Sequence, residues 1–311
     1  MTNKQRVLEG LSGPEKRIPS RYHYDERGSE LFEEITRLDE YYPTRTEKAL
    51  LKHWVPKWVK DRHPATLVEL GAGNSEKSRL ILDVMVAQEA ECAYVPIDVS
   101  GPFLQETARQ LGTEYPTLTI APLVADIMEH ISVSRELPSP RWVAFLGSTL
   151  GNFEGYESVS LLKGVATQLD KDDRFVLGFD LRPGPNKSVE RIELAYNDAA
   201  GVTAEFSLNI LAALNHEFGT DFDLAAFRHR SSYDGERGRI ETYIESLRDQ
   251  IVHFPTGEEI SVVKGESTKT EISHKYDRAT IDSMFSHAGL LVDDWVEDDR
   301  GYYALVLARP L

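Results

Sequence analysis

Cysteine and long apolar runs are both scarce in this sequence of 311 residues. Cys92 is the single cysteine, so an intramolecular disulfide is impossible and a cysteine-based zinc site is disfavoured. The nine histidines show no metal-ligand spacing, and we expect no metal site. No stretch approaches the roughly 20 apolar residues that cross a bilayer, and the polar segment 1–17 lacks the apolar core of a signal peptide. We therefore expect a cytoplasmic protein with no membrane partner.

Acidic residues outnumber basic ones: the chain has 51 Asp and Glu residues and 35 Lys and Arg residues, and its formal net charge is −16. Such an acidic surface repels phosphate backbones, which argues against a nucleic-acid partner. Hydrophobic residues make up 41% of the chain and can bury a real core. The length suits one large domain or two modest ones, and we expect a monomer.

The middle of the chain alternates between strand and helix patterns. Strands are expected at 66–70, 93–97, 118–124, 141–146 and 174–179, with helices at 78–88, 101–111 and 158–169. This alternation predicts a five-strand parallel core with helices on both faces. An insertion follows, with a long helix at 187–217 and antiparallel strands at 239–247 and 259–264. A helix at 278–288 and a hairpin of strands at 290–295 and 302–309 then complete the sheet.

A glycine-rich turn follows the first strand, at the sheet edge where ligands of such folds bind. Gly71 and Gly73 let the backbone turn sharply and approach a ligand, although a lone Gly-x-Gly also occurs in ordinary turns. The third glycine of a dinucleotide fingerprint would fall at position 76, which is Glu76. A pyrophosphate-binding turn is therefore disfavoured.

Acidic residues end the next two strands and suggest a nucleoside ligand. Asp98 can accept both ribose hydroxyls, and Asp126 is placed to meet the adenine amino group; the alternative is that each acid caps the following helix. S-Adenosylmethionine carries no phosphate and has a cationic sulfonium, so an acidic turn does not repel it. Lys77 can reach its carboxylate, hold the turn, or simply be exposed. This set predicts S-adenosylmethionine as the cofactor.

Four further segments are unusual in composition. They are the aromatic-rich stretch 22–47, the strand end FLGSTLGNF at 145–153, AYNDAAGVTAEF at 195–206 and TEISHKY at 270–276. Together with the glycine-rich turn, they closely resemble the histidine-specific Nα-methyltransferase family of ergothioneine biosynthesis, from about Tyr22 to the C-terminus. Members of that family trimethylate the α-amino group of L-histidine to hercynine, and the resemblance implies the same substrate here.

The resemblance also implies a fold of the α/β class, a Rossmann-like class I methyltransferase sheet with an inserted α+β substrate-binding domain. Residues 55–186 and 275–311 would form the S-adenosylmethionine-binding core. Residues 18–54 and 187–274 would form the substrate-binding domain, and residues 1–17 an N-terminal tail.

Roles follow from the resemblance residue by residue. The cofactor positions are matched by Gly71, Lys77, Asp98 and Asp126. The residues that hold the histidine carboxylate are matched by Tyr41, Asn152 and Tyr196, those that recognise the imidazole by Glu271 and Ser273, and those around the amino group by Tyr24, Phe32 and Gly147. Thr242 stands where the family commonly carries methionine, which leaves a smaller and more polar wall in the amino-acid pocket.

The chemistry agrees with these roles. Methyl transfer from a sulfonium is an in-line displacement that needs alignment and an unprotonated amine; Tyr24 or a bound water is the expected proton acceptor. The rings of Phe32 and Tyr24 suit the trimethylammonium product. Glu271 can accept an imidazole N–H while Ser273 serves the other nitrogen.

Plainer interpretations exist for the same residues. Without the resemblance, Tyr24, Phe32 and Tyr41 would be assigned to the core, the pair Glu271 and Ser273 to a solvated strand face, and Asn152 to a helix cap. At the level of function, the alternatives are the same chemistry on another amino acid such as tryptophan or tyrosine, a non-catalytic amino-acid-binding protein, and a nicotinamide-dependent dehydrogenase, against which Glu76 argues.

Overall fold

The computed structural model describes residues 2–88, 90–128 and 134–311, so Met1 of the expected tail lies outside it. The chain forms two compact units. We call Pro43–Lys187 with His274–Leu311 the sheet unit, and Met1–Tyr42 with Ser188–Ser273 the insertion unit. Across the described ranges, no helix is long and apolar enough to cross a membrane.

The sheet unit is built on a sheet with the strand order β12-β13-β6-β5-β1-β2-β3, in which β4 also pairs with β2. The strands are β1 (Thr66–Leu70), β2 (Ala93–Asp98), β3 (Thr119–Ile120), β4 (Leu123–Val124), β5 (Arg141–Phe145), β6 (Arg174–Asp180), β12 (Leu290–Glu297) and β13 (Tyr303–Pro310). The pairings among β1 to β6 are parallel, whereas β13 runs antiparallel to both β6 and β12. Chain order reverses at β1, which has β2 on one side and β5 on the other. This is a Rossmann-like sheet, and the reversal point marks where such folds bind ligands.

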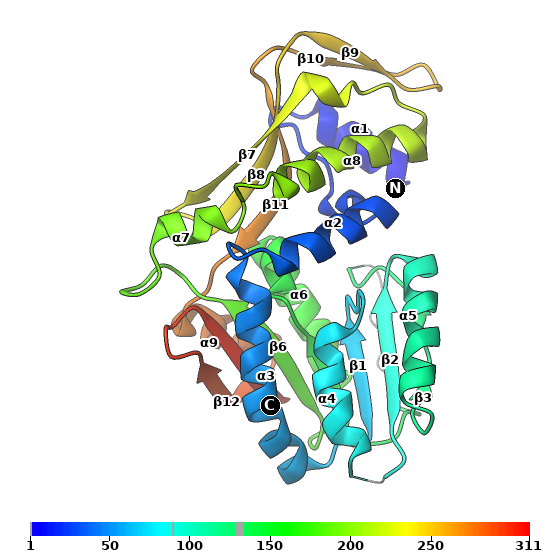
Figure 1. Ribbon diagram of the computed structural model, residues 1–311, viewed down its shortest axis with the longest axis vertical. Coiled ribbons are helices and arrows are strands. Elements are labelled where there is room, and N and C mark those ends of the chain that lie inside the picture. Colours follow the sequence, from blue (N-terminus) through cyan, green and yellow to red (C-terminus); the bar gives the residue numbers. More distant parts are fainter. Residues whose placement is uncertain (1, 89, 129–133) are drawn as a thin grey trace. The chain divides into compact units, whose positions relative to one another are not determined.

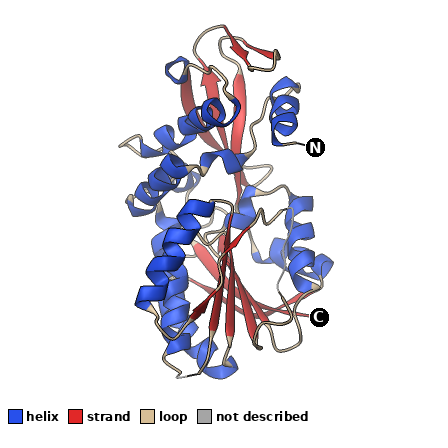
Figure 2. Ribbon diagram, turned by 90° about the vertical axis from the view of Figure 1, so that its right-hand side faces the viewer, coloured by secondary structure: helices blue, strands red, loops and turns tan. Residues whose placement is uncertain are grey.

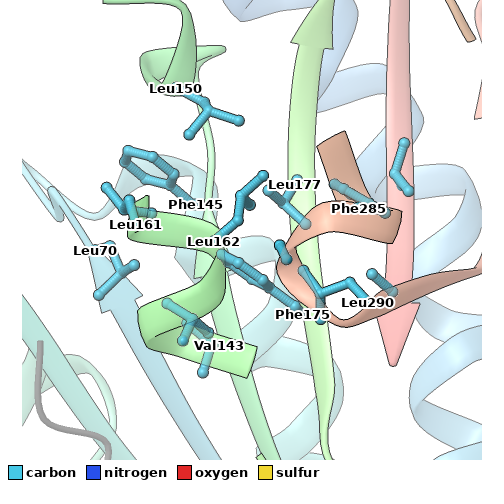
Figure 3. Close-up of a cluster of buried hydrophobic side chains, with 14 of the residues drawn as sticks. Leu70, Val143, Phe145, Leu150, Leu161, Leu162, Phe175, Leu177, Phe285 and Leu290 are labelled. Carbon is cyan, nitrogen blue, oxygen red and sulfur yellow. The ribbon is translucent and has the colours of Figure 1, made fainter. Parts of the chain in front are cut away.

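Helices cover both faces of this sheet (Figures 1 and 2). They are α3 (Tyr42–Arg62), α4 (Glu76–Val86), α5 (Gly101–Glu114), α6 (Gly155–Ala166) and α9 (Arg278–Ala288), with the short 3-10 helix η2 (Thr149–Asn152) after β5. Side chains of α3, α4 and α5 pack with Leu67 of β1, whereas those of α6 and α9 pack with its neighbour Val68. Successive residues of a strand point to opposite faces, so one short apolar strand supplies both cores. Figure 3 shows part of the second cluster, including Val143 and Phe175 from neighbouring strands and Leu162 from α6.

The third expected strand, 118–124, is two short strands instead of one. Both β3 and β4 pair with β2, and the break between them contains Pro122. Proline has no backbone N–H to give to a sheet ladder, which explains the interruption.

The insertion unit contains a three-stranded sheet in the order β11-β8-β7 and a β9-β10 hairpin. Its strands are β7 (Phe227–Asp234), β8 (Arg239–Ser246), β9 (Gln250–His253), β10 (Glu259–Val262) and β11 (Ser267–His274). Its helices are α1 (Asn3–Ser12), α2 (Glu26–Arg37), α7 (Val189–Leu194) and α8 (Val202–Phe218), with the 3-10 helices η1 (Ser20–His23) and η3 (Leu224–Ala226). Val7 and Leu11 of α1 are buried in the core of this unit. The segment expected to be a tail is therefore part of the fold.

Two further expectations differ from the structure. Residues 43–54, which were expected to join the insertion, lie in α3, because Leu50 and Leu51 pack in the sheet-unit core. The helix expected at 187–217 is interrupted between α7 and α8. Asp198 accepts hydrogen bonds from the backbone N–H groups of Val202 and Thr203 at 2.9 and 2.8 Å, and these bonds stabilise the start of α8 as a separate helix.

Candidate active site

The glycine-rich turn leaves β1 with two residues in the left-handed region. Gly71 and Gly73 have φ of +68° and +51°, which glycine adopts without strain. A Cβ at either position would have no atom within 4 Å, so backbone conformation and not crowding selects glycine. The N–H groups of Gly71 and Ala72 donate to the Ile97 carbonyl at 2.8 and 3.0 Å, which ties the turn to the end of β2.

Asp98 holds this turn from the end of β2. Its Oδ2 accepts the Gly73 N–H at 2.9 Å and its Oδ1 accepts the Ser100 N–H at 3.0 Å. Ser100 is the N-cap of α5, so Asp98 is not simply a helix cap. Asp126 follows β4, the strand paired with the end of β2, and its Oδ1 accepts the Met128 N–H at 2.9 Å. Both carboxylates thus lie at neighbouring strand ends and both are half-buried.

A third carboxyl group lies near the end of β1, just before the turn. Glu69 is buried, accepts a hydrogen bond from the Tyr94 hydroxyl, and has a pKa that burial raises to about 7. Tyr94 also lies 2.8 Å from Ser75 Oγ, and Ser75 is itself in the left-handed region with φ of 54°. These contacts fix the turn from inside the sheet.

Glu47 of α3 connects two candidate site residues, and it was not itself among the predicted ones although it ends the stretch 22–47. Its side chain is fully buried and accepts hydrogen bonds from Lys77 Nζ at 2.8 Å and from the Tyr303 hydroxyl at 2.8 Å. Both of its oxygens lie 2.9 Å from the backbone N of Gly147. The structure thus joins two predicted site residues, Lys77 and Gly147, through a third that was not predicted.

The loop after β5 has an unusual backbone. Gly147 and Ser148 have φ of +80° and +57°, and the Ser148 hydroxyl accepts the Asp180 N–H at 2.9 Å. Asn152 ends η2 and is half-buried. The N-cap of α6 is Glu154. The plainer interpretation of Asn152 as a helix cap therefore does not hold.

In the insertion unit, the predicted aromatic residues form a continuous row of ring contacts. Tyr24 and Phe32 have ring centroids 5.8 Å apart, Phe32 and Tyr41 6.2 Å, and Tyr41 and Tyr196 6.3 Å. Phe206 of α8 joins them, 5.7 Å from Tyr24 and 6.0 Å from Phe32. Phe206 ends the unusual segment 195–206 but was not among the predicted site residues.

The turn before α2 fixes the start of this row. Asp25 caps α2 by accepting the Gly28 N–H at 2.7 Å, and it also accepts Asn209 Nδ2 at 2.7 Å. A Cβ at Gly28 would overlap the carbonyl oxygen of His23, so only glycine fits there. His23 is fully buried and stacks on Phe206 at 4.7 Å, and burial lowers its pKa to about 4.

The row ends on polar groups. Tyr196 and Ser273 are both buried, and the Tyr196 hydroxyl donates to Ser273 Oγ at 2.9 Å. Glu271 and Ser273 both lie in β11, two residues apart, and so share one face of the strand. His229 Nε2 lies 2.9 Å from the Tyr196 carbonyl oxygen, which anchors the backbone at that ring.

Thr242 is buried in β8, and its hydroxyl lies 3.1 Å from Ser231 Oγ on the paired strand β7. The threonine hydroxyl therefore has a partner within the sheet.

The predicted residues divide between the two units. The insertion unit contains Tyr24, Phe32, Tyr41, Tyr196, Thr242, Glu271 and Ser273, and the sheet unit contains Gly71, Lys77, Asp98, Asp126, Gly147 and Asn152. In the part of the chain that the structure describes, no group of three or more His, Cys, Asp or Glu side chains is arranged to hold a metal ion.

Comparisons with known proteins concern the chain as a whole. The model of a family described as histidine-specific methyltransferase, SAM-dependent, matches residues 3–310. The chain is 37% identical over 303 residues to the histidine N-alpha-methyltransferase of Mycolicibacterium smegmatis, covering 97% of this chain and 93% of that protein. It is 35% identical over 305 residues to the Mycobacterium tuberculosis protein of the same name, with 97% and 93% covered.

Among solved structures, an S-adenosylmethionine-dependent methyltransferase from Clostridium acetobutylicum has a similar fold, with a TM-score of 0.50 at 12% identity over 90% of this chain and 97% of that one. The sheet topology, the glycine-rich turn and the family match over nearly the whole chain lead to one conclusion: the chain belongs to the histidine-specific, S-adenosylmethionine-dependent methyltransferases.

Proposed function

We propose that the protein transfers three methyl groups, one from each of three S-adenosylmethionine molecules, to the α-amino group of L-histidine and so forms hercynine. The observation that carries this proposal is the row of rings from Tyr24 to Tyr196 that ends on the Ser273 hydroxyl. An apolar, electron-rich wall at one end and a polar pair at the other suit an amino acid with a cationic amino group and a polar side chain. The match of the histidine-specific family to residues 3–310 supports histidine as that amino acid.

Each methyl transfer forms one N–C bond and breaks one C–S bond. The amine lone pair attacks the methyl carbon, S-adenosylhomocysteine leaves, and the positive charge passes from sulfur to nitrogen. The amine must be neutral for each attack, so one proton leaves the nitrogen before each of the three transfers, to water directly or through the Tyr24 hydroxyl, which passes its own proton on as it accepts one. Alignment supplies most of the acceleration in such a reaction.

The amino-group end is assigned to Tyr24, Phe32 and Phe206, whose rings meet edge to face or tilted at 5.7–6.0 Å. Aromatic faces attract a quaternary ammonium by about 0.5–2 kcal/mol each. The ring faces need no N–H from the ligand, which suits the trimethylated nitrogen because it has no N–H left. This end therefore stabilises the fixed cation that accumulates as the methyl groups are added.

The imidazole end is assigned to Glu271 and Ser273. A carboxylate accepts an N–H, and a hydroxyl can donate to or accept from the second ring nitrogen. The Tyr196 hydroxyl, which the resemblance assigns to the histidine carboxylate, donates to Ser273 Oγ, and we therefore assign it to this end of the site as well. Ser273 is buried and Glu271 is half-buried, and such a site disfavours side chains that leave the buried hydroxyl without a partner, because an unmet buried polar group costs about 1–3 kcal/mol.

The donor is assigned to the strand ends of the sheet unit. Asp98 is held in place by two backbone N–H groups, and a carboxylate has further lone pairs for the ribose hydroxyls. Asp126 is assigned to the adenine amino group. Val99 and Met128 are 42% and 37% exposed beside these carboxylates in the sequence, and they offer apolar contact for a purine. Lys77 is assigned to the carboxylate of the donor.

The test is a competition experiment in which purified protein receives S-adenosylmethionine and an equimolar mixture of the common amino acids. We expect mono-, di- and trimethylated histidine in the mass spectrum and no methylated tryptophan or tyrosine. Methylation of another amino acid in preference to histidine would assign the site to that substrate. Binding of histidine without any methylated product would make the protein a binding protein and overturn the enzymatic proposal.

A further inference from the structure

One buried carboxylate joins four elements of the sheet unit. Glu47 of α3 has no exposed side-chain surface and receives Lys77 Nζ of α4, the Gly147 N–H after β5 and the Tyr303 hydroxyl of β13. The distances are 2.8 Å to Lys77, 2.9 Å to Gly147 and 2.8 Å to Tyr303. A buried charge is tolerated only when it is paired and hydrogen-bonded, and both conditions hold here.

The sheet leaves room for this carboxylate at a specific position. Gly178 lies in the central strand β6, and a Cβ there would overlap Glu47 Oε1 and the Tyr303 hydroxyl. Glycine weakens the interior of a strand, so its presence in a strand often marks the close approach of another group. The approaching group here is the Glu47 side chain.

We propose that Glu47 is a positioning residue for the methyl donor, which it does not itself touch. This inference rests on the proposed function, in which Lys77 binds the donor carboxylate; for Gly147, a role around the amino group is what the family resemblance implies. A lysine ammonium has three donors on a flexible four-carbon stem. Glu47 takes one of these donors and fixes the stem, which leaves the ammonium oriented for a second carboxylate. Lys77 is 23% exposed, so a ligand can reach it.

The contact with Glu47 also orients the peptide group of Gly147. Its N–H points at both oxygens of Glu47, so Gly147 can serve an amino group only through its carbonyl oxygen. A carbonyl accepts the N–H of an amine and offers nothing to a carboxylate. A Cβ at Gly147 would come 2.8 Å from Lys77 Nζ, so the glycine also keeps the ammonium in its place.

The experiment compares Glu47→Gln with the wild-type protein by calorimetric titration of S-adenosylmethionine and by steady-state kinetics for both substrates. The Gln side chain presents Lys77 with either an N–H donor or a neutral carbonyl oxygen in place of a charged carboxylate oxygen. We expect the Kd for S-adenosylmethionine to rise about tenfold, the change that the loss of one charge-assisted hydrogen bond produces. The KM for histidine at saturating donor should change less than threefold. In a Lys77→Met background, Glu47→Gln should add less than twofold, because the two residues act through one contact.

The matched control is Asp173→Asn in the same unit. Asp173 is also fully buried and accepts the Arg141 backbone N–H at 2.6 Å together with its guanidinium, but it lies where β5 and β6 begin, at the opposite end of those strands. We expect this variant to lower the melting temperature and to leave the Kd for S-adenosylmethionine unchanged. The control therefore separates general loss of stability from loss of donor positioning.

A fall in melting temperature for Glu47→Gln with a wild-type Kd for S-adenosylmethionine would overturn the positioning role, as would full additivity with Lys77→Met. Tyr303→Phe keeps the Glu47 charge and removes one of its anchors, so it covers the case in which Glu47→Gln does not fold. It should weaken donor binding two- to threefold, and an unchanged Kd would overturn the inference. If Lys77→Met alone leaves the Kd unchanged, the proposed role of Lys77 fails instead.

Discussion

Removal of the Tyr196 hydroxyl tests the polar end of the proposed histidine site. Tyr196→Phe deletes one hydrogen bond, of 2.9 Å, between two buried residues, Tyr196 and Ser273. Such a bond contributes about 1 kcal/mol net, which corresponds to roughly fivefold in a dissociation constant. We therefore expect the Kd for histidine to rise at least fivefold while the Kd for S-adenosylmethionine stays constant, because Ser273 is no longer held toward the ligand.

A double-mutant cycle with Ser273→Ala gives the decisive number. If the two hydroxyls act as one unit, the double variant should bind histidine about 1 kcal/mol better than the sum of the single effects predicts. Tyr243→Phe is the matched control, since its hydroxyl donates to Glu241 at 2.5 Å in the same unit but outside the proposed site. Effects of Tyr196→Phe and Ser273→Ala that add within about 0.3 kcal/mol would refute the reasoning, as would an equal loss of histidine binding in Tyr243→Phe.

Two further predictions concern the wall of rings. Burial lowers the pKa of His23 to about 4. The neutral ring therefore favours the folded state above pH 6.5, and the free energy of unfolding falls by about 3 kcal/mol in total as the pH drops from 6.5 to 4. A His23 ring proton that titrates near pH 6.5 in an NMR experiment would contradict this. Phe206→Leu removes one aromatic face and should weaken the binding of hercynine about fivefold more than that of histidine, whereas calorimetric titrations showing equal losses would argue against a role for Phe206 at the ammonium.

Much of the sheet unit could be predicted from the sequence because its parallel strands are short, mostly apolar and closely followed by glycine or aspartate. The strand expected at 66–70 is β1, which is buried at every position. The insertion unit was harder to predict. Strands β7 and β11 are rich in charged and hydroxyl side chains, and they become strands by pairing with β8, which local sequence does not encode. In these two segments, pairing with β8 outweighs the low intrinsic strand propensity of the sequence.

The proposed site shows the same limit. Long motifs pointed to residues such as Asn152, Tyr196 and Glu271, whose assignments remain proposals. Glu47 stands between a threonine and a lysine in a helical segment and looks like a solvated residue. Its partners Gly147 and Tyr303 are 100 and 256 residues away, so only the folded chain reveals the contact.

The most direct test of the proposed function is the product formed from L-histidine and methyl-deuterated S-adenosylmethionine, followed by tandem mass spectrometry. We expect a product that carries three deuterated methyl groups and releases fully deuterated trimethylamine on fragmentation, because all three sit on the α-nitrogen. Label retained on the imidazole fragment, or no transfer to histidine at all, would contradict the proposed function.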